Sequence, residues 1–202
     1  MGLSRILVSG LMALVLTGCA GNWEVDYGDG LPADVTKNWR LADVVAVVPE
    51  SLSVSNANTF APNADIVWHG DPFGDRKAQV AAIVDRGITQ GASELSGTRP
   101  VTITALVEEF HGVTPMAVAR APAAVHNITY LIQVIDASTG QPLTQQERIQ
   151  ADLEAFVGNA AVASAINGKT QKVRITNHLA AVTRGWLGFG PDQRREFSGF
   201  GR

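Results

Sequence analysis

The spacing of apolar residues between positions 43 and 110 limits the fold more than any other feature of this chain. Residues 43–48 form a short, mostly β-branched run that Pro49 ends, which predicts a strand buried on both faces. Residues 76–95 place apolar side chains three and four positions apart, as in an amphipathic helix. Residues 100–110 then alternate apolar and polar side chains, as a strand does. Strand, helix and strand in this order predict a crossover unit with parallel strands.

Two glycines lie one turn apart on the apolar stripe of this helix, Gly87 and Gly91. Glycine inside a helix costs about 1 kcal/mol relative to alanine. Their position on the buried face therefore predicts close approach to a sheet or to another helix. The helix begins with Asp71 or with Asp75 as its N-cap, since both precede suitable first-turn residues.

The second half of the chain adds two strands and a helix. Residues 128–136 and 148–157 alternate apolar and polar side chains around a turn at 137–140, which predicts an antiparallel meander with the preceding strand. Residues 170–187 form a second amphipathic helix. We therefore expect an α+β fold of two layers. Its mixed, mostly antiparallel sheet, in the order strand–helix–strand–strand–strand–helix, carries both amphipathic helices on one face.

The chain has one cysteine in 202 residues, Cys19, so an internal disulfide is excluded, and a lipid on this cysteine would also exclude a thiolate metal site. The formal net charge is −3, and this mild acidity argues against a nucleic-acid partner, which clustered Lys and Arg would bind.

The N-terminus has the layout of a secretory signal. Arg5 precedes the apolar run 6–16, which is shorter than the about 20 residues needed to span a bilayer. The sequence Leu16-Thr17-Gly18-Cys19 that follows resembles the lipobox of bacterial lipoproteins. That resemblance implies cleavage of a signal peptide at residues 1–18 and a lipid on Cys19. Two or more acyl chains would anchor the protein durably.

The residue after the cysteine is Ala20, which favours the inner leaflet of the outer membrane, facing the periplasm. Residues 19–38 lack apolar periodicity, so we expect a lipidated, flexible tether that holds the domain roughly 25 Å from the membrane. Residues 39–187 are expected to form one domain, and 188–202 a flexible C-terminal tail.

The connection at residues 112–125 is unusually apolar for a loop, since Arg120 is its only charged residue. One hypothesis is that Val113, Met116 and Val118 contact a membrane partner, together with the phenylalanines of the tail. The alternative is that the loop folds back onto the domain.

Motifs for catalysis or cofactor binding are weak, so we expect no enzyme, no metal and no cofactor. Gly168-Lys169-Thr170 lacks the glycine five positions earlier that a phosphate-binding loop needs, and it is read as a helix N-terminus. A minor hypothesis is an acid–base or metal site at Glu109, His111 and His126, because the two histidines bracket one connection between strands.

The region from Trp39 to Trp186 resembles an uncharacterised family of alphaproteobacterial envelope lipoproteins. The residues that carry the resemblance are 46–49, 65–68, 71–76 and 126–130. The family has no assigned activity, so it implies no catalytic residues.

These observations predict a non-enzymatic accessory or scaffold lipoprotein of an envelope assembly for transport, secretion or assembly. The alternative is a binding module for a small apolar or lipid-like ligand held between the helices and the sheet.

Overall fold

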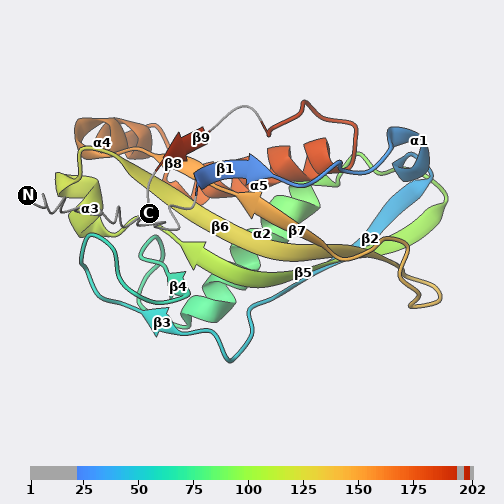
Figure 1. Cartoon of the computed structure of the whole chain (residues 1–202), viewed down its shortest axis with the longest axis horizontal. Coiled ribbons are helices and arrows are strands. Elements are labelled where there is room, and N and C mark those ends of the chain that lie inside the picture. The colour runs from blue at the N-terminus through green and yellow to red at the C-terminus, as the bar shows by residue number, and fades with distance from the viewer. Residues whose placement is uncertain (1–21, 195–197, 201–202) are drawn as a thin grey trace, which may run out of the picture.

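The computed structural model describes residues 22–194 and 198–200, and the strands of this part form one mixed sheet of nine (Figure 1). The strands are β1 (Asn22–Asp26), β2 (Trp39–Val47), β3 (Val54–Ser55), β4 (Ile66–Val67), β5 (Arg99–His111), β6 (Ala124–Asp136), β7 (Glu147–Ala151), β8 (Leu153–Ala155) and β9 (Ser198–Phe200). The helices are α1 (Ala33–Thr36), α2 (Arg76–Gly91), α3 (Pro115–Arg120), α4 (Gly158–Ile166) and α5 (Gln171–Trp186).

The pairing of the strands agrees with the predicted topology. β2 pairs with β5 in parallel, from Trp39 opposite Arg99 to Val47 opposite Leu106, with α2 between them in the chain. β5, β6 and β7 pair in turn as an antiparallel meander. The main path through the sheet is β3-β4-β5-β6-β7-β1-β9, and β8 also pairs with β6.

The helices α2 and α5 pack side by side on one face of the sheet (Figure 1). Asp75 is the N-cap of α2, and its side chain accepts a hydrogen bond from the backbone N–H of Ala78 at 3.0 Å. A Cβ built on Gly87 would lie 2.6 Å from the Cβ of Leu179, so only glycine lets α5 approach this closely. The predicted close approach is confirmed.

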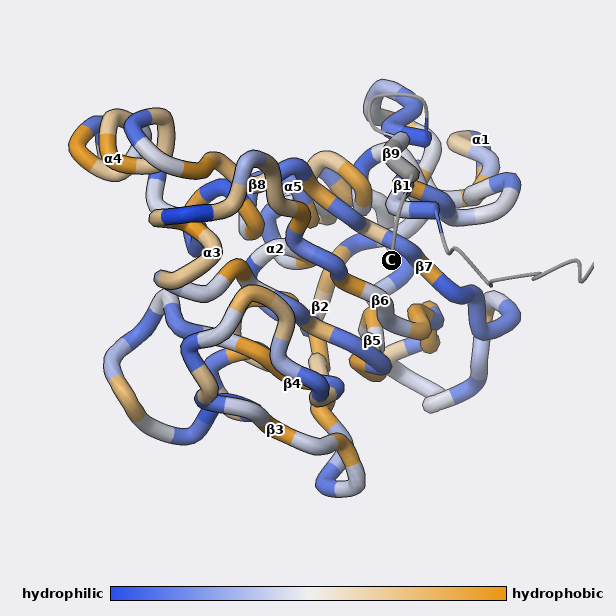
Figure 2. Tube along the Cα trace, turned by 60° about the vertical axis from the view of Figure 1, so that its left-hand side comes forward, coloured by the Kyte–Doolittle hydropathy of each residue, from blue (hydrophilic) through white to orange (hydrophobic). Residues whose placement is uncertain are grey.

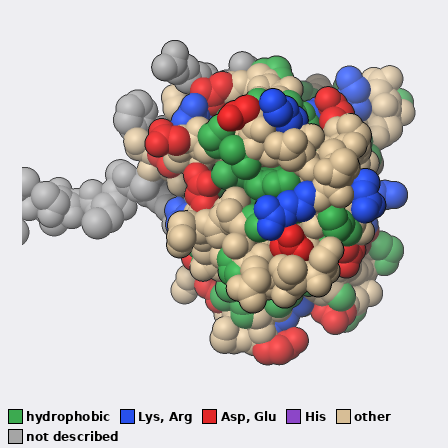
Figure 3. All heavy atoms as spheres, turned by 90° about the vertical axis from the view of Figure 1, so that its right-hand side faces the viewer, with side chains coloured by type: hydrophobic (Ala, Val, Ile, Leu, Met, Phe, Trp, Pro, Cys, Tyr) green, Lys and Arg blue, Asp and Glu red, His purple; other side chains and the backbone are tan. Residues whose placement is uncertain are grey.

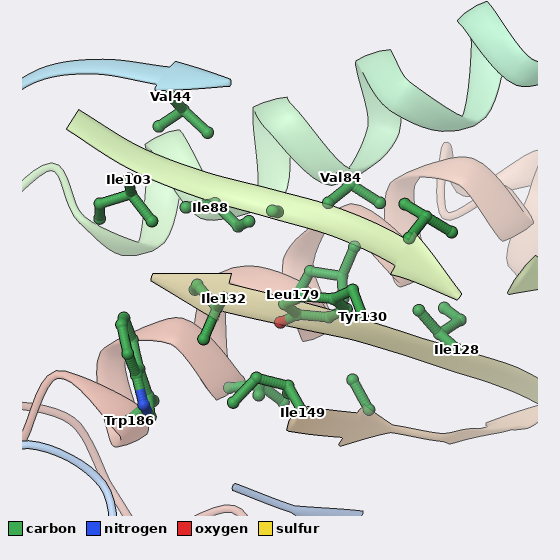
Figure 4. Close-up of a cluster of buried hydrophobic side chains, with 14 of the residues drawn as sticks. Val44, Val84, Ile88, Ile103, Ile128, Tyr130, Ile132, Ile149, Leu179 and Trp186 are labelled. Carbon is green, nitrogen blue, oxygen red and sulfur yellow. The ribbon is translucent and has the colours of Figure 1, made fainter. Parts of the chain in front are cut away.

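The core fills the space between the helices and the sheet, as Figure 4 shows for side chains of both layers. Ten of them are Val44, Val84, Ile88, Ile103, Ile128, Tyr130, Ile132, Ile149, Leu179 and Trp186. The predicted two-layer α+β fold, with both amphipathic helices on one face, is confirmed.

The first strand of the crossover unit is less buried than its apolar run predicts. Val44 is buried, but Val45 and Val47 are 42% and 47% exposed. The helices cover one face of β2 only, and its other face is open. The expectation of burial on both faces is therefore wrong.

The segment predicted as a tether is part of the fold from Asn22 onward. β1 pairs with β7 on one side and with β9 on the other. Tyr27 is buried, and its hydroxyl donates to Asp192 Oδ1 at 2.8 Å. The hydroxyl of Thr36 in α1 donates to the carbonyl of Leu187 at 2.8 Å. The expectation of a flexible tether is thus wrong for residues 22–38.

The described part of the C-terminal segment is likewise bound to the domain. Phe189 packs against the core, and the 198–200 strand pairs with β1. These contacts do not fit the expected flexible tail at 188–202. Phe197 lies outside the described residues, as do the predicted signal peptide at 1–18 and Cys19.

The two ends of the domain differ in character. α3 and α4 lie at one end, and α4 projects from it as a largely apolar helix (Figure 2). α1 and the β6–β7 connection lie at the opposite end, where Lys, Arg, Asp and Glu side chains surround a strip of hydrophobic ones (Figure 3). None of the helices in residues 22–194 combines the length and the hydrophobicity needed to cross a bilayer.

Candidate binding cleft

A β-bulge in β5 decides which side chains reach the sheet face that the helices leave uncovered. Val107 lies opposite Tyr130, but Glu109 lies opposite Thr129, so Glu108 is an extra residue. Before the bulge, the odd-numbered residues of β5 point to the core. After the bulge, the even-numbered Phe110 points to the core and has no exposed surface. The bulge thereby turns Glu109 and His111 to the uncovered face.

A cleft of about 1000 Å³ lies over this face, at the α3 end of β5 and β6. One wall is the connection from β3 to β4, including Phe60 and Ala64, and the other is the segment 121–125 that follows α3. Trp23 of β1 also lines it. The lining is more apolar than polar, which is usual for binding sites in proteins.

Hydrogen bonds hold the two walls together through the start of α3. The Thr114 hydroxyl accepts from the N–H of Ala117 as the N-cap and donates to the carbonyl of Thr59 at 2.6 Å. The N–H of Met116 donates to Asn58 Oδ1 at 2.7 Å. The connection from β3 to β4, which has little regular structure of its own, is thereby fixed in place.

Polar groups gather at the base of the cleft. Asn127 lies opposite His111 in the β5–β6 ladder and is 5% exposed. Its Oδ1 has no hydrogen-bond partner among the described residues. His111 Nδ1 is 3.6 Å from Glu109 Oε1, and its Nε2 contacts the carbonyl of Ala64. An ion pair of Arg148 with Glu108, at 2.8 Å, lies beside them.

The structure brings Glu109 and His111 together but separates His126 from them. His126 lies one residue from Asn127 on β6, so its side chain points to the opposite, helix-covered face, where it has no exposed surface. Burial first, then the charges of Arg174 and His178, lowers the pKa of His126 to about 3. His126 is a neutral core residue, and the predicted trio does not converge. No group of three or more metal-ligating side chains occurs in the part of the chain that the structure describes.

The apolar loop at 112–125 folds back onto the domain, which was the alternative left open by the sequence. It forms α3, and Val113 and Ala117 are buried in a small cluster with Ala155 of β8. Val118 packs against this cluster and Met116 is partly buried. One of the three predicted contact residues, Val113, lines the cleft, but only 6% of its surface is accessible.

Comparison with known proteins places the chain in a family without assigned activity. A model for a family of unknown function, DUF6778, matches residues 39–202. The chain belongs to this family. The matched region leaves out Cys19, so membership does not bear on lipid attachment. Among curated proteins, none matches this sequence.

The solved structures that match this chain are distant from it. A crystal structure of a candidate lipoprotein from Caulobacter crescentus has 11% identity and a TM-score of 0.34, over 77% of this chain and 93% of that one. Two dodecamers of PelC from Paraburkholderia phytofirmans, the first of them a point variant, have 12% and 13% identity and TM-scores of 0.31 and 0.32. They cover 77% of this chain and 96% of theirs.

Sequence reasoning missed Asn127 and Trp23 as lining residues. The signal for Asn127 was its alternation with Ile128 and Tyr130. The shift in apolar spacing from two to three between Val107 and Phe110 marks the bulge that turns His111 to the same face. Trp23, Val25 and Tyr27 are spaced two residues apart, a strand pattern that is too short to stand out.

Proposed function

We propose that this protein is a lipid-anchored, non-enzymatic accessory subunit of an envelope assembly, attached through Cys19 to the outer membrane and facing the periplasm. The observation that carries the proposal is the short distance in sequence between the lipobox cysteine and the sheet. Cys19 precedes Asn22, the first residue of β1, by three positions. Three residues span at most about 11 Å, so an anchor there would hold the domain against the membrane.

The cleft is the surface through which such a subunit would bind its partner. Its walls are mainly apolar, and Asn127 offers an amide whose acceptor is unpaired among the described residues. An asparagine amide has one acceptor and two donors, which complements a peptide group. A protein segment with apolar side chains fits this lining better than a charged small molecule does.

The proposal includes no catalytic role. This part of the proposal is supported by the position of His126, which lies on the sheet face opposite Glu109 and His111. The three side chains of the hypothetical acid–base or metal site are therefore not together.

The anchor is tested by mass spectrometry of the protein purified from envelope, with the Cys19→Ala protein as control. The expected result is a mature chain that begins at Cys19 with the mass of attached acyl groups, and an outer-membrane location that the control loses. An unmodified Cys19 would refute the anchor.

The partner is tested by in-cell photocrosslinking from Ala123 on the cleft wall, with the same probe at Thr89 on α2 as control, since both side chains are exposed. We expect one envelope protein to be captured from position 123 and not from 89, and Asn127→Leu to weaken its capture. Capture that is equal at both positions, or that Asn127→Leu leaves unchanged, would refute the cleft as the docking site.

A small apolar or lipid-like ligand is the second candidate, because the cleft lining is more apolar than polar. The core fills the space between helices and sheet, so this alternative moves to the uncovered face. Native mass spectrometry of the purified protein would then show a bound small molecule that Asn127→Leu displaces.

A further inference from the structure

The end of the domain formed by α3 and α4 has the chemistry of a membrane-contact surface. Every residue of α4 is exposed or half-buried, although apart from Gly158, Asn159 and Ser164 the helix consists of alanine, valine and isoleucine. Val162 is 58% exposed and Ile166, one turn later, is 80% exposed. Phe156, just before the helix, is 40% exposed.

A short apolar helix of this kind is not expected to be stable in water by itself. Isolated helices of fewer than about 12 residues are marginal, and helices in proteins gain most of their stability by burying an apolar face. Among the elements of the domain, α4 contacts mainly α3. Its outer face, which Figure 2 shows projecting from the domain, is left without a partner in the described part of the chain.

The first strand begins toward this end (Figure 1), and the lipobox cysteine precedes it in sequence by three positions. Val25 lies opposite Ala151. Next to this pair, the N–H of Glu24 donates to the side-chain Oδ2 of Asp152, and the carbonyl of Glu24 accepts from the backbone N–H of Asp152. β1 is antiparallel to β7, so its first residue, Asn22, lies toward the end of the domain that carries α3 and α4 (Figure 1). Asn22 follows Cys19 by three positions, a reach of at most about 11 Å.

The charges around α4 suit a phospholipid surface. Arg120 at the end of α3 and Lys169 after α4 are exposed and make no ion pair with any described residue. Arg174 stacks on Phe156, 3.7 Å from the ring centroid, at the edge of an apolar groove of about 330 Å³ between α3, α4 and α5. The Arg174 guanidinium also donates to the backbone carbonyl of Glu154 at 2.7 Å. Basic residues around an apolar helix favour anionic headgroups.

We infer that the outer face of α4, with Val162 and Ile166, inserts into the same membrane leaflet that holds the Cys19 lipid. This second contact fixes the orientation of the domain, with α4 in the headgroup region and the β6–β7 connection pointing away. The inference rests on the proposed lipid anchor.

The test uses the lipidated, full-length protein in vesicles of phosphatidylethanolamine and phosphatidylglycerol. Because the one native cysteine carries the lipid, a cysteine introduced by Ile166→Cys is the sole free thiol for an environment-sensitive fluorophore. The matched control is Ser138→Cys, which is exposed in the β6–β7 connection, about 40 Å away along the length of β6. Both substitutions are at exposed sites, so the fold is retained.

We expect the label at 166 to shift its emission to the blue and to be quenched by nitroxide-bearing lipids, and the label at 138 to do neither. Val162→Ser should reduce the shift at 166, whereas Val35→Ser, at a valine of similar exposure in α1, should not. A water-like signal at 166 in protein whose acyl mass is present would overturn this inference and leave the anchor intact. Protein without the acyl mass would overturn both.

Discussion

His126 provides a sharp test of the core, because it is a titratable side chain with no exposed surface and with both ring nitrogens unpartnered among the described residues. Replacing it with leucine removes the titration while keeping an apolar group of similar size. Since neither nitrogen is bonded there, we expect His126→Leu to be as stable as the native protein, or more stable, at pH 7.5.

The difference between the two proteins should grow in acid. The pKa of His126 is lowered to about 3, so the folded state holds it neutral at pH 5, while the unfolded chain, with a histidine pKa of about 6.5, takes up a proton. A depressed histidine pKa gives stability that is complete above about pH 6.5 and is lost as the pH falls toward 3. Linkage gives a loss of about 2 kcal/mol at pH 5 relative to pH 7.5.

Urea unfolding of the mature chain with Cys19→Ala, at pH 7.5 and pH 5, measures this loss. We expect the native side chain to lose about 2 kcal/mol more than His126→Leu between the two pH values. His178, whose pKa burial lowers to about 4, titrates in both proteins and cancels in the comparison. Equal losses in the two proteins would show that His126 is already solvated or paired, and the reasoning would fail.

Three further substitutions test the packing and the caps. Gly91→Ala would put a Cβ 2.5 Å from the Cβ of Thr183, and it should lower the free energy of unfolding by about 1–3 kcal/mol in urea titrations; an unchanged value would contradict the close packing. Asp152→Ala removes a buried carboxylate that accepts from the N–H of Ile128 at 3.0 Å and from the N–H of Glu24 in β1. It should lower the free energy of unfolding by about 3 kcal/mol and speed proteolysis within β1; resistance equal to that of the native protein would refute its role. Thr170→Ala removes the N-cap of α5 and should lower stability by about 1 kcal/mol in the same titrations.

The central part of the fold could be predicted because its elements are long and regular. α2 and α5 each have 16 residues, and β5 and β6 each have 13, so their apolar periodicity is repeated enough to be read. Their order then determines the pairing, since a strand after a crossover helix returns in parallel and strands after short connections return antiparallel.

The elements that were missed are short or break their own periodicity. β1 has five residues and lies in a segment rich in Gly, Asp and Pro, so its contribution depends on β7 and β9, which are more than 100 positions away. The sequence of β1 alone does not indicate which distant strands it pairs with. The bulge at Glu108 is one residue long, yet it turns His111 of β5 to the face on which Asn127 of β6 lies and away from the face of His126. The candidate cleft could therefore not be assembled by assuming strict alternation.

The incorporation of β1 into the sheet changes what an anchor at Cys19 would do. A flexible tether of 19 residues would let the domain turn freely roughly 25 Å from the membrane and reach partners at many angles. With the chain fixed from Asn22 by its pairing to β7, an anchor three residues earlier leaves little freedom to turn. The cleft is then held at a constant height, because Trp23 of the same strand lines it. The cleft would therefore bind a partner segment beside the membrane surface rather than deep in the periplasm. This position favours a membrane-embedded assembly over a diffusing protein as the partner.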